Sequence, residues 1–494
     1  MELSRRQLLT GAAAITAAAA LPPFASAAPT PVTLRVLKRS IEVNGRAASV
    51  FGIVQPDGTP GLVTSVDAPF RVRLDNQAGE ETLVHWHGLA PPATQDGVPG
   101  LSQPLLASGA AYDYDFPLQR PGTFWMHSHH GLQEQRLLAA PLIVRERENA
   151  TRDAQDVVIL LHDFTFRDPQ EIYAELTSGA AMMDHGTMGM GQAMPMEPGD
   201  MAGMDHDAMG QGAEMPGMSH LNDVTYDAYL ANDRTLDDPE VVPVEPRSLV
   251  RLRIINGAAS TNFWIDLGAL DGHLLAVDGS PCRRSKIDDA GKILRGRRFP
   301  LAMSQRIDVA VGIPAAGAYP ILAQREGDRA QTGIILATPG AAIARVAGTA
   351  TEPAPPLGLD LDREIAAVYP LGRAADRRHT LDLTGSMMGF VWSLNGRKFG
   401  AHEPLRVRQG ERVEIEMVNR TDMSHPMHLH GHTFQVVGID RQPLYGPMRD
   451  TVLVPVNGRV TIAFDADNPG RWALHCHNLY HMAAGMMTTV EYEA

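Results

Sequence analysis

The sequence predicts an all-β protein built from three β-rich units, and three observations support this. The chain has 494 residues, enough for about three domains of roughly 150 residues each. Its 46 glycines and 36 prolines, with few long helical patterns, are typical of short strands joined by turns. Apolar residues also recur in short runs along most of the chain, as strands that bury a face require.

The first predicted unit spans residues 29–146. Residues 69–74 read as a strand of alternating character, and residues 122–126 form a strand that runs directly into His127. A histidine is therefore expected at the end of this strand.

The second predicted unit spans residues 147–340. It has buried-strand runs at residues 157–161, 249–255 and 306–311. This unit has none of the histidine and cysteine motifs described below, so we expect it to space or shield the other two units.

Residues 341–378 are rich in Ala and Pro and are predicted to be a linker. The third predicted unit spans residues 379–494, with strands at residues 412–418 and 458–464.

The N-terminal residues 1–28 are predicted to be a twin-arginine signal peptide. Arg5 and Arg6 precede an Ala-rich apolar stretch, which ends in the small residues Ala25, Ser26 and Ala27. The alternative is a transmembrane anchor, but the stretch is short and rich in Ala for that role. We expect cleavage near Ala27 and a periplasmic protein that has no membrane association afterwards.

The formal charge of −14 argues against nucleic acid or an anionic membrane surface as a partner. It is compatible with cationic substrates, although solubility alone would also explain it.

A short stretch of residues near the C-terminus contains candidate metal ligands. Cys476, His481 and Met486 supply a thiolate, an imidazole and a thioether, the ligand types of a mononuclear blue-copper site with Met as the weak axial ligand. On an extended strand, His475 and His477 would both point away from the face that Cys476 occupies. A second metal centre can therefore lie on the opposite side.

Three further His-x-His pairs supply imidazole ligands, which suit copper. A single pair is weak evidence, but four pairs, one of them enclosing the cysteine, are not expected by chance. The three pairs, the last preceded by His425, are His85 and His87, His127 and His129, and His428 and His430.

With these motifs the chain resembles the multicopper oxidases, especially the periplasmic copper-tolerance (cuprous oxidase, laccase-like) branch. The resemblance implies three cupredoxin-like Greek-key sandwiches and four copper ions, with a trinuclear cluster held between the first and last units. The implied ligands are His425, Cys476, His481 and Met486 for type 1 copper; His85 and His428 for type 2; and His87, His127, His129, His430, His475 and His477 for the type 3 pair.

The chain has two cysteines, and no disulfide is expected because Cys476 is committed to metal. Cys282 is predicted to be a buried structural thiol.

Residues 181–221 form an insertion with eleven methionines among Gly, Asp, Pro and His. They lack apolar periodicity, so we expect a mobile segment rather than a packed element. Thioethers select Cu(I), so the segment is predicted to raise the local Cu(I) concentration. The alternative is a tolerated low-complexity loop. Related enzymes often carry such a segment in the last domain, whereas here it lies in the second.

The resemblance also implies a substrate-copper site near His425, formed by Asp422, Met423, Met387 and Met388. For Met387 and Met388, a role in the core at a strand edge is an equal alternative.

Oxygen reduction consumes protons, and Asp96 lies where the family places the carboxylate that supplies them. Asp96 and Cys476 are therefore the predicted catalytic residues, although an Asp before Gly97 is also a common turn cap. Met482 stands where related cuprous oxidases often have a second acid.

The histidines left without a copper role outside the insertion are expected to form hydrogen bonds; they are His130, His162, His273, His379, His402 and His432.

The leading hypothesis is thus an oxidase that couples oxidation of Cu(I), and also of phenols, to reduction of dioxygen to water. The alternatives are a general laccase, a non-catalytic copper store, and a copper nitrite reductase, which needs no type 3 pair. A monomer is expected.

Overall fold

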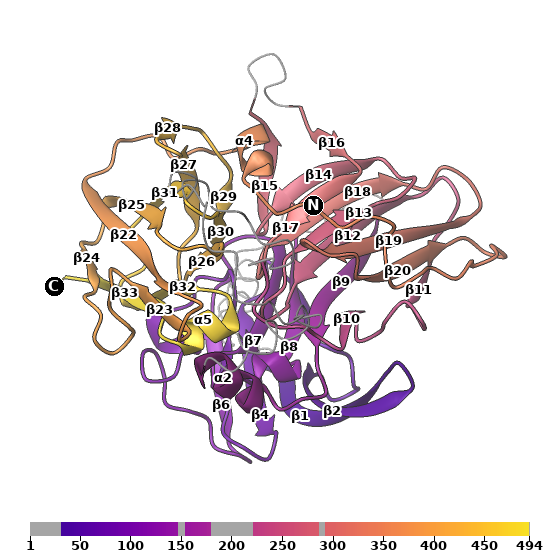
Figure 1. The fold of residues 1–494 in the computed structure, drawn as a ribbon, viewed down its shortest axis with the longest axis horizontal. Coiled ribbons are helices and arrows are strands. Elements are labelled where there is room, and N and C mark those ends of the chain that lie inside the picture. Colours follow the sequence, from indigo (N-terminus) through magenta and orange to yellow (C-terminus); the bar gives the residue numbers. More distant parts are fainter. Residues whose placement is uncertain (1–30, 147–153, 179–220, 286–291, 494) are drawn as a thin grey trace, which may run out of the picture.

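The computed structural model describes residues 31–146, 154–178, 221–285 and 292–493. The predicted signal peptide and all but the last residue of the Met-rich insertion lie outside the described residues. Within them the chain is mostly β, as the sequence predicted, and its strands form six sheets. Figure 1 shows three groups of strands in sequence order, packed against one another.

The first group consists of two four-stranded sheets, with strand orders β2-β1-β4-β6 and β3-β8-β7-β5. Apolar side chains from both sheets, including Leu34, Val72 and Leu142, share one core. The elements are β1 (Val32–Val43), β2 (Arg46–Val54), β3 (Leu62–Ser65), β4 (Phe70–Gln77), β5 (Val84–His85), η2 (Ala93–Gln95), β6 (Ala111–Phe116), β7 (Gly122–Ser128), η3 (Glu134–Arg136) and β8 (Ala139–Arg145).

Strand β7 differs from an ordinary sandwich strand. Whereas β4 alternates buried and more exposed residues, every residue of β7 is buried. The outward-facing Trp125 packs against Leu160 and Ile255 of the second group. Both faces of the strand that leads to His127 are thus removed from water.

The second group consists of an eight-stranded sheet, β10-β9-β12-β18-β14-β15-β21 with β16 beside β14, and a five-stranded sheet, β11-β20-β19-β13-β17. Its elements are β9 (Ala154–Phe164), α2 (Pro169–Ser178), β10 (Ala228–Ala231), β11 (Val241–Pro243), β12 (Leu249–Asn256), β13 (Phe263–Asp266), β14 (Gly272–Val277), β15 (Ser280–Arg284), β16 (Leu294–Gly296), β17 (Arg298–Leu301), β18 (Arg306–Gly312), β19 (Ala318–Arg325) and β20 (Gln331–Ala337).

The segment predicted as a linker contributes α4 (Asp360–Glu364) and β21 (Ile365–Ala367). Strand β21 pairs with β15, so part of residues 341–378 completes a sheet of the second group. The boundaries of the three units stay predictions.

The third group consists of a seven-stranded sheet, β23-β22-β25-β31-β27-β28 with β29 beside β27, and a five-stranded sheet, β24-β33-β32-β26-β30. Its elements are β22 (Arg377–Ser386), β23 (Val391–Leu394), β24 (Leu405–Val407), β25 (Arg412–Asn419), β26 (His425–Leu429), β27 (Phe434–Ile439), β28 (Gln442–Pro443), β29 (Met448–Arg449), β30 (Thr451–Val454), β31 (Arg459–Asp465), β32 (Arg471–Cys476), α5 (Leu479–Ala483) and β33 (Met487–Tyr492).

Candidate metal centres

Two antiparallel strand pairs place histidines opposite one another in the same way. In the first group β5 pairs with β7, so that His85 lies opposite His127. In the third group β26 pairs with β32, so that His428 lies opposite His475. Each of these histidines belongs to a His-x-His pair, and the two halves face one another across the junction between the first and third groups.

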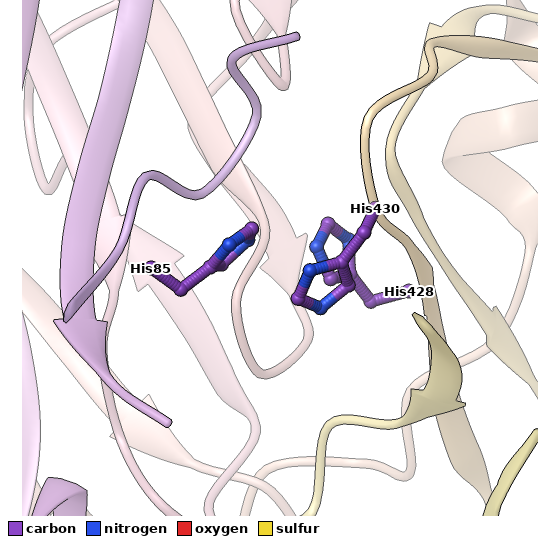
Figure 2. Close-up of side chains that lie close together, drawn as sticks. All are labelled: His85, His428 and His430. Atoms are coloured by element: carbon purple, nitrogen blue, oxygen red, sulfur yellow. The ribbon is translucent and has the colours of Figure 1, made fainter. Parts of the chain in front are cut away.

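The two halves meet in one buried cluster of eight imidazoles. The ring centroids of His85 and His430 are 3.8 Å apart, as are those of His87 and His428. Figure 2 shows His85 extending from the first group toward His428 and His430 of the third. Candidate ligand atoms of several three-residue sets lie within 4.8 Å of one another, including His85 with His428 and His430. Residues far apart in the sequence can therefore share metal ions.

Hydrogen bonds at the outer side of the cluster fix which nitrogen faces inward. The Nδ1–H groups of His85 and His428 donate to the carbonyl oxygens of Asp96 and Asp450, each at 2.8 Å. His127 Nδ1 lies 2.9 Å from Glu134 Oε2, a carboxylate that the sequence did not single out. With Nδ1 protonated, the lone pair lies on Nε2, which is then free to bind a metal ion.

Several of these inward nitrogens are buried without a hydrogen-bond partner. They are Nε2 of His85, His127, His428 and His477, together with Nδ1 of His87. Buried polar atoms are rarely left unpaired in folded proteins. Imidazole lone pairs aimed into one shared space are the donor set that copper prefers, so the cluster fits copper.

Burial also keeps the imidazoles uncharged. Burial is the main reason why the pKa of His475 falls to about 4. Burial, helped by repulsion from neighbouring imidazoles, lowers the pKa of the other shifted members well below 6.5; they are His87, His127, His129, His428, His430 and His477. A neutral imidazole is the form that binds metal, so these side chains need not release protons first.

A second centre lies on the other side of Cys476. The Sγ atom of Cys476 is 3.6 Å from His425 Nδ1 and 3.8 Å from His481 Nδ1, and the two nitrogens are 3.2 Å apart. All three residues are fully buried, as is Met486, whose carbonyl accepts a hydrogen bond from the Cys476 N–H. Two imidazoles and one cysteine sulfur within reach of one another, with a buried methionine joined to the cysteine through the backbone, supply the ligand types of a blue-copper site.

The outward nitrogens of this centre are also held in place. Thr421 Oγ1 lies 2.8 Å from His425 Nε2. Asp223, from the second group, places Oδ2 3.1 Å from His481 Nε2, and its side chain is fully buried. No local sequence signal marks Asp223, because it meets His481 only in the folded chain.

The two centres are joined by consecutive residues. Cys476 stands between His475 and His477, and its carbonyl oxygen accepts a hydrogen bond of 2.9 Å from His475 Nδ1. Burial raises the pKa of the Cys476 thiol, so the thiolate would form only with metal bound.

Cys282, in β15, is also buried, which raises its pKa to about 12 and agrees with a structural thiol.

Asp96 contacts a histidine of each half of the cluster. Its Oδ2 accepts a hydrogen bond of 2.8 Å from His430 Nδ1, and its carbonyl accepts the one from His85. Only 1% of its surface is exposed. A plain turn cap would not need to reach across the junction.

The four residues predicted for substrate copper differ in their surroundings. Met423 is buried in the apolar core, and Met387 packs against that core. Asp422 is exposed, and 76% of Met388 is exposed. This set stays a prediction.

Among the histidines without a copper role, His162, His379, His402 and His432 form ring hydrogen bonds, as expected.

The fold and the two centres define a copper-dependent oxidoreductase. Models of the multicopper oxidase family match residues 38–149 and 373–494, and a twin-arginine signal model matches residues 2–22. The multicopper oxidase MmcO of Mycobacterium tuberculosis (strain ATCC 25618 / H37Rv) is 32% identical, over 97% of this chain and 90% of the relative. The chain therefore belongs to the multicopper oxidase family.

Copper resistance protein A of Escherichia coli is 27% identical, over 96% of this chain and 94% of the relative. The solved multi-copper oxidase from Pseudomonas thermotolerans superposes with a TM-score of 0.65 at 23% identity, covering 94% of this chain and all of the other. It shares the cupredoxin-like fold.

The family uses type 1, type 2 and type 3 copper with dioxygen as the acceptor, and the signal peptide indicates export to the periplasm. Across the described residues, no helix has the length and apolar character that crossing a membrane requires.

Proposed function

We propose that this enzyme oxidises Cu(I), passes the electrons to the trinuclear cluster for reduction of dioxygen to water, and thereby serves copper tolerance. One observation carries this proposal: the described residues on both sides of the Met-rich insertion contact the type 1 region. Before it, Tyr173 of α2 donates a hydrogen bond to the carbonyl of Ala483 in α5. After it, Asp223 contacts His481. The described residues that flank the thioether-rich segment in the sequence thus contact α5 and His481, beside which electrons would enter.

The ligand assignment follows the arrangement described above. His425, Cys476, His481 and Met486 would hold type 1 copper; His85 and His428 type 2; and His87, His127, His129, His430, His475 and His477 the type 3 pair. Bound copper supplies the one-electron steps. The chain keeps the imidazoles neutral, excludes water, links the centres through Cys476 and holds a carboxylate, Asp96, where oxygen would consume protons. All these ligands come from one chain, so a monomer is the proposed active form.

The carboxylate at His481 favours a cationic substrate. Asp223 is buried beside the type 1 imidazole, and its negative charge would stabilise a positive charge that approaches or develops there. The copper resistance proteins among the relatives agree with a copper substrate.

Phenols are the second candidate, favoured by apolar surface near the same centre. Met388 is 76% exposed and Val391 is 43% exposed, on either side of Phe390, whose ring lies 5.8 Å from that of His481. A flat aromatic substrate could pack there. A copper store is less well supported, because storage needs no cluster between two sandwiches.

Oxygen uptake by the copper-loaded enzyme tests the proposal. We expect fast uptake with Cu(I), and phenol oxidation that rises strongly when excess Cu(II) is added. Full phenol activity without added copper, together with slow uptake on Cu(I), would favour a general laccase. No oxygen uptake with either substrate would favour storage.

A further inference from the structure

The second group of strands supplies a buried cation to the far side of the histidine cluster. Arg306, at the start of β18, is completely buried. Its Nη1 and Nη2 donate to the two carboxylate oxygens of Asp450, at 2.7 and 2.5 Å. Its Nε donates to the carbonyl of Thr123 in β7, at 3.2 Å. One guanidinium therefore connects all three groups of strands.

The residues beside Arg306 extend the same contact. Ser304 Oγ donates to Thr451 Oγ1 at 3.1 Å, and Gln305 Nε2 donates to the Thr451 carbonyl at 3.1 Å. Three consecutive residues of the second group thus hold Asp450 and Thr451 of the third in one orientation.

Asp450 in turn contacts two histidines of the cluster. Its Oδ1 accepts a hydrogen bond of 3.1 Å from His87 Nε2, and its carbonyl accepts one from His428 Nδ1. Because His87 donates from Nε2, its lone pair lies on Nδ1, which is buried without a partner. The Asp450 carboxylate therefore fixes the tautomer of His87, which is opposite to that of His85 and His428.

The backbone after His87 leaves no room for the ion pair to move. Gly88 has φ +87, and a Cβ there would lie 2.5 Å from Arg306 Nη2 and 2.8 Å from Asp450 Oδ2. The His87–Gly88 backbone thus packs directly against the Arg306–Asp450 pair. A change in the pair would displace the ligand-bearing strand end as well as the carboxylate.

We infer that Arg306 is a positioning residue for the trinuclear cluster: through Asp450 it fixes the tautomer and orientation of His87 and the orientation of His428. The inference rests on the proposed ligand assignment for these two histidines. Removing Arg306 would leave the buried Asp450 carboxylate without its cationic partner, held only by its hydrogen bonds with His87 and Thr451. Partners that orient metal ligands in this way typically contribute 10- to 100-fold in metal affinity.

The test compares Arg306→Gln and Arg306→Lys with Arg253→Gln. Arg253 is also a buried arginine of the second group that bonds to Thr123, but its carboxylate partners are Asp156 and Asp308, away from the cluster. For each copper-loaded protein, type 2 copper is followed by electron paramagnetic resonance during titration with a copper chelator. The type 1 absorption band is recorded in the same samples.

We expect Arg306→Gln to release type 2 copper at roughly 10- to 100-fold lower chelator concentration, with the type 1 band retained. Arg306→Lys should lie between Arg306→Gln and the wild type, and Arg253→Gln should match the wild type. Wild-type retention of type 2 copper in Arg306→Gln would overturn the inference, as would equal losses in Arg306→Gln and Arg253→Gln. A wild-type protein without a type 2 signal would instead overturn the ligand assignment itself.

If Arg306→Gln does not fold, the Arg306→Met, Asp450→Asn double variant replaces it, because it removes both buried charges together. Weakened type 2 copper with a normal type 1 band then supports the inference. Wild-type affinity in this variant overturns it.

Discussion

Asp96 Oδ2 accepts a hydrogen bond of 2.8 Å from His430 Nδ1, so a carboxylate of the first sandwich orients an imidazole of the third. The same residue contacts His85 through its carbonyl oxygen. One aspartate therefore touches a histidine on each side of the junction, which agrees with the proposal that its carboxylate supplies protons for oxygen reduction.

Replacing this carboxylate should slow oxygen reduction and leave electron entry intact. We expect Asp96→Asn to lower kcat for oxygen uptake by about 100-fold, the usual scale for a lost acid–base group. Anaerobic reduction of type 1 copper by substrate should keep its wild-type rate, as followed by stopped-flow absorption. Asp113→Asn, which alters an exposed ion pair with Arg73, is the control. A parallel fall in both rates would show that Asp96 acts only on folding or copper loading.

Removing the charge beside His481 should alter electron entry. An anion near copper stabilises the doubly charged oxidised ion, so Asp223→Asn should raise the type 1 reduction potential. It should also lower kcat/KM for Cu(I) by roughly tenfold, because the approaching cation loses a carboxylate partner. A redox titration and oxygen uptake measure the two effects. Asp227→Asn, at an exposed position of the same segment, should change neither. An unchanged potential in Asp223→Asn would contradict the electrostatic role.

Deleting residues 181–220 should separate the two candidate substrates. The residues that contact α5 and His481, Tyr173 and Asp223, lie outside the deleted segment. If the methionines concentrate Cu(I), the KM for Cu(I) should rise by about tenfold or more, and phenol oxidation should keep its rate. A full-length variant with Leu at the eleven methionine positions tests the thioethers alone and should behave like the deletion. Wild-type KM in both proteins would favour a tolerated loop.

The sequence predicted the part of the site that depends on local spacing. The His-x-His spacing marked His85 with His87 and His428 with His430 as candidate ligands before the fold was known, although β5 ends at His85 and β26 ends at Leu429, so the second histidine of each pair follows its strand. Asp450 and Asp223 could not, because each gains its role from a distant partner: Arg306 and His87 for the first, His481 for the second. Nothing in the neighbouring residues signals such contacts.

The second unit illustrates the same limit. It has none of the histidine and cysteine motifs, and the sequence therefore predicted a spacing or shielding role. The structure shows that this unit also contacts both centres, through Asp223 at His481 and through Arg306 at Asp450. The Met-rich insertion lies in this unit, yet the described residues flanking it contact α5 and His481, because the second and third units pack together there.

The copper-free protein should lose stability as the pH falls from about 6.5 toward 4. The buried imidazoles stay neutral in the folded state and protonate in the unfolded chain, so the unfolded state binds more protons in this window. Burial lowers the folded-state pKa of His475 from 6.5 to about 4. This residue alone then costs about 1.4 kcal/mol per pH unit between these values; the cost is absent above 6.5 and reaches its full size below about 4. Urea unfolding of the copper-free protein at several pH values measures the slope, and His475→Gln should make it shallower by about that amount. Identical slopes in the two proteins would mean that His475 is protonated in the folded state as readily as in the unfolded chain, which its burial argues against.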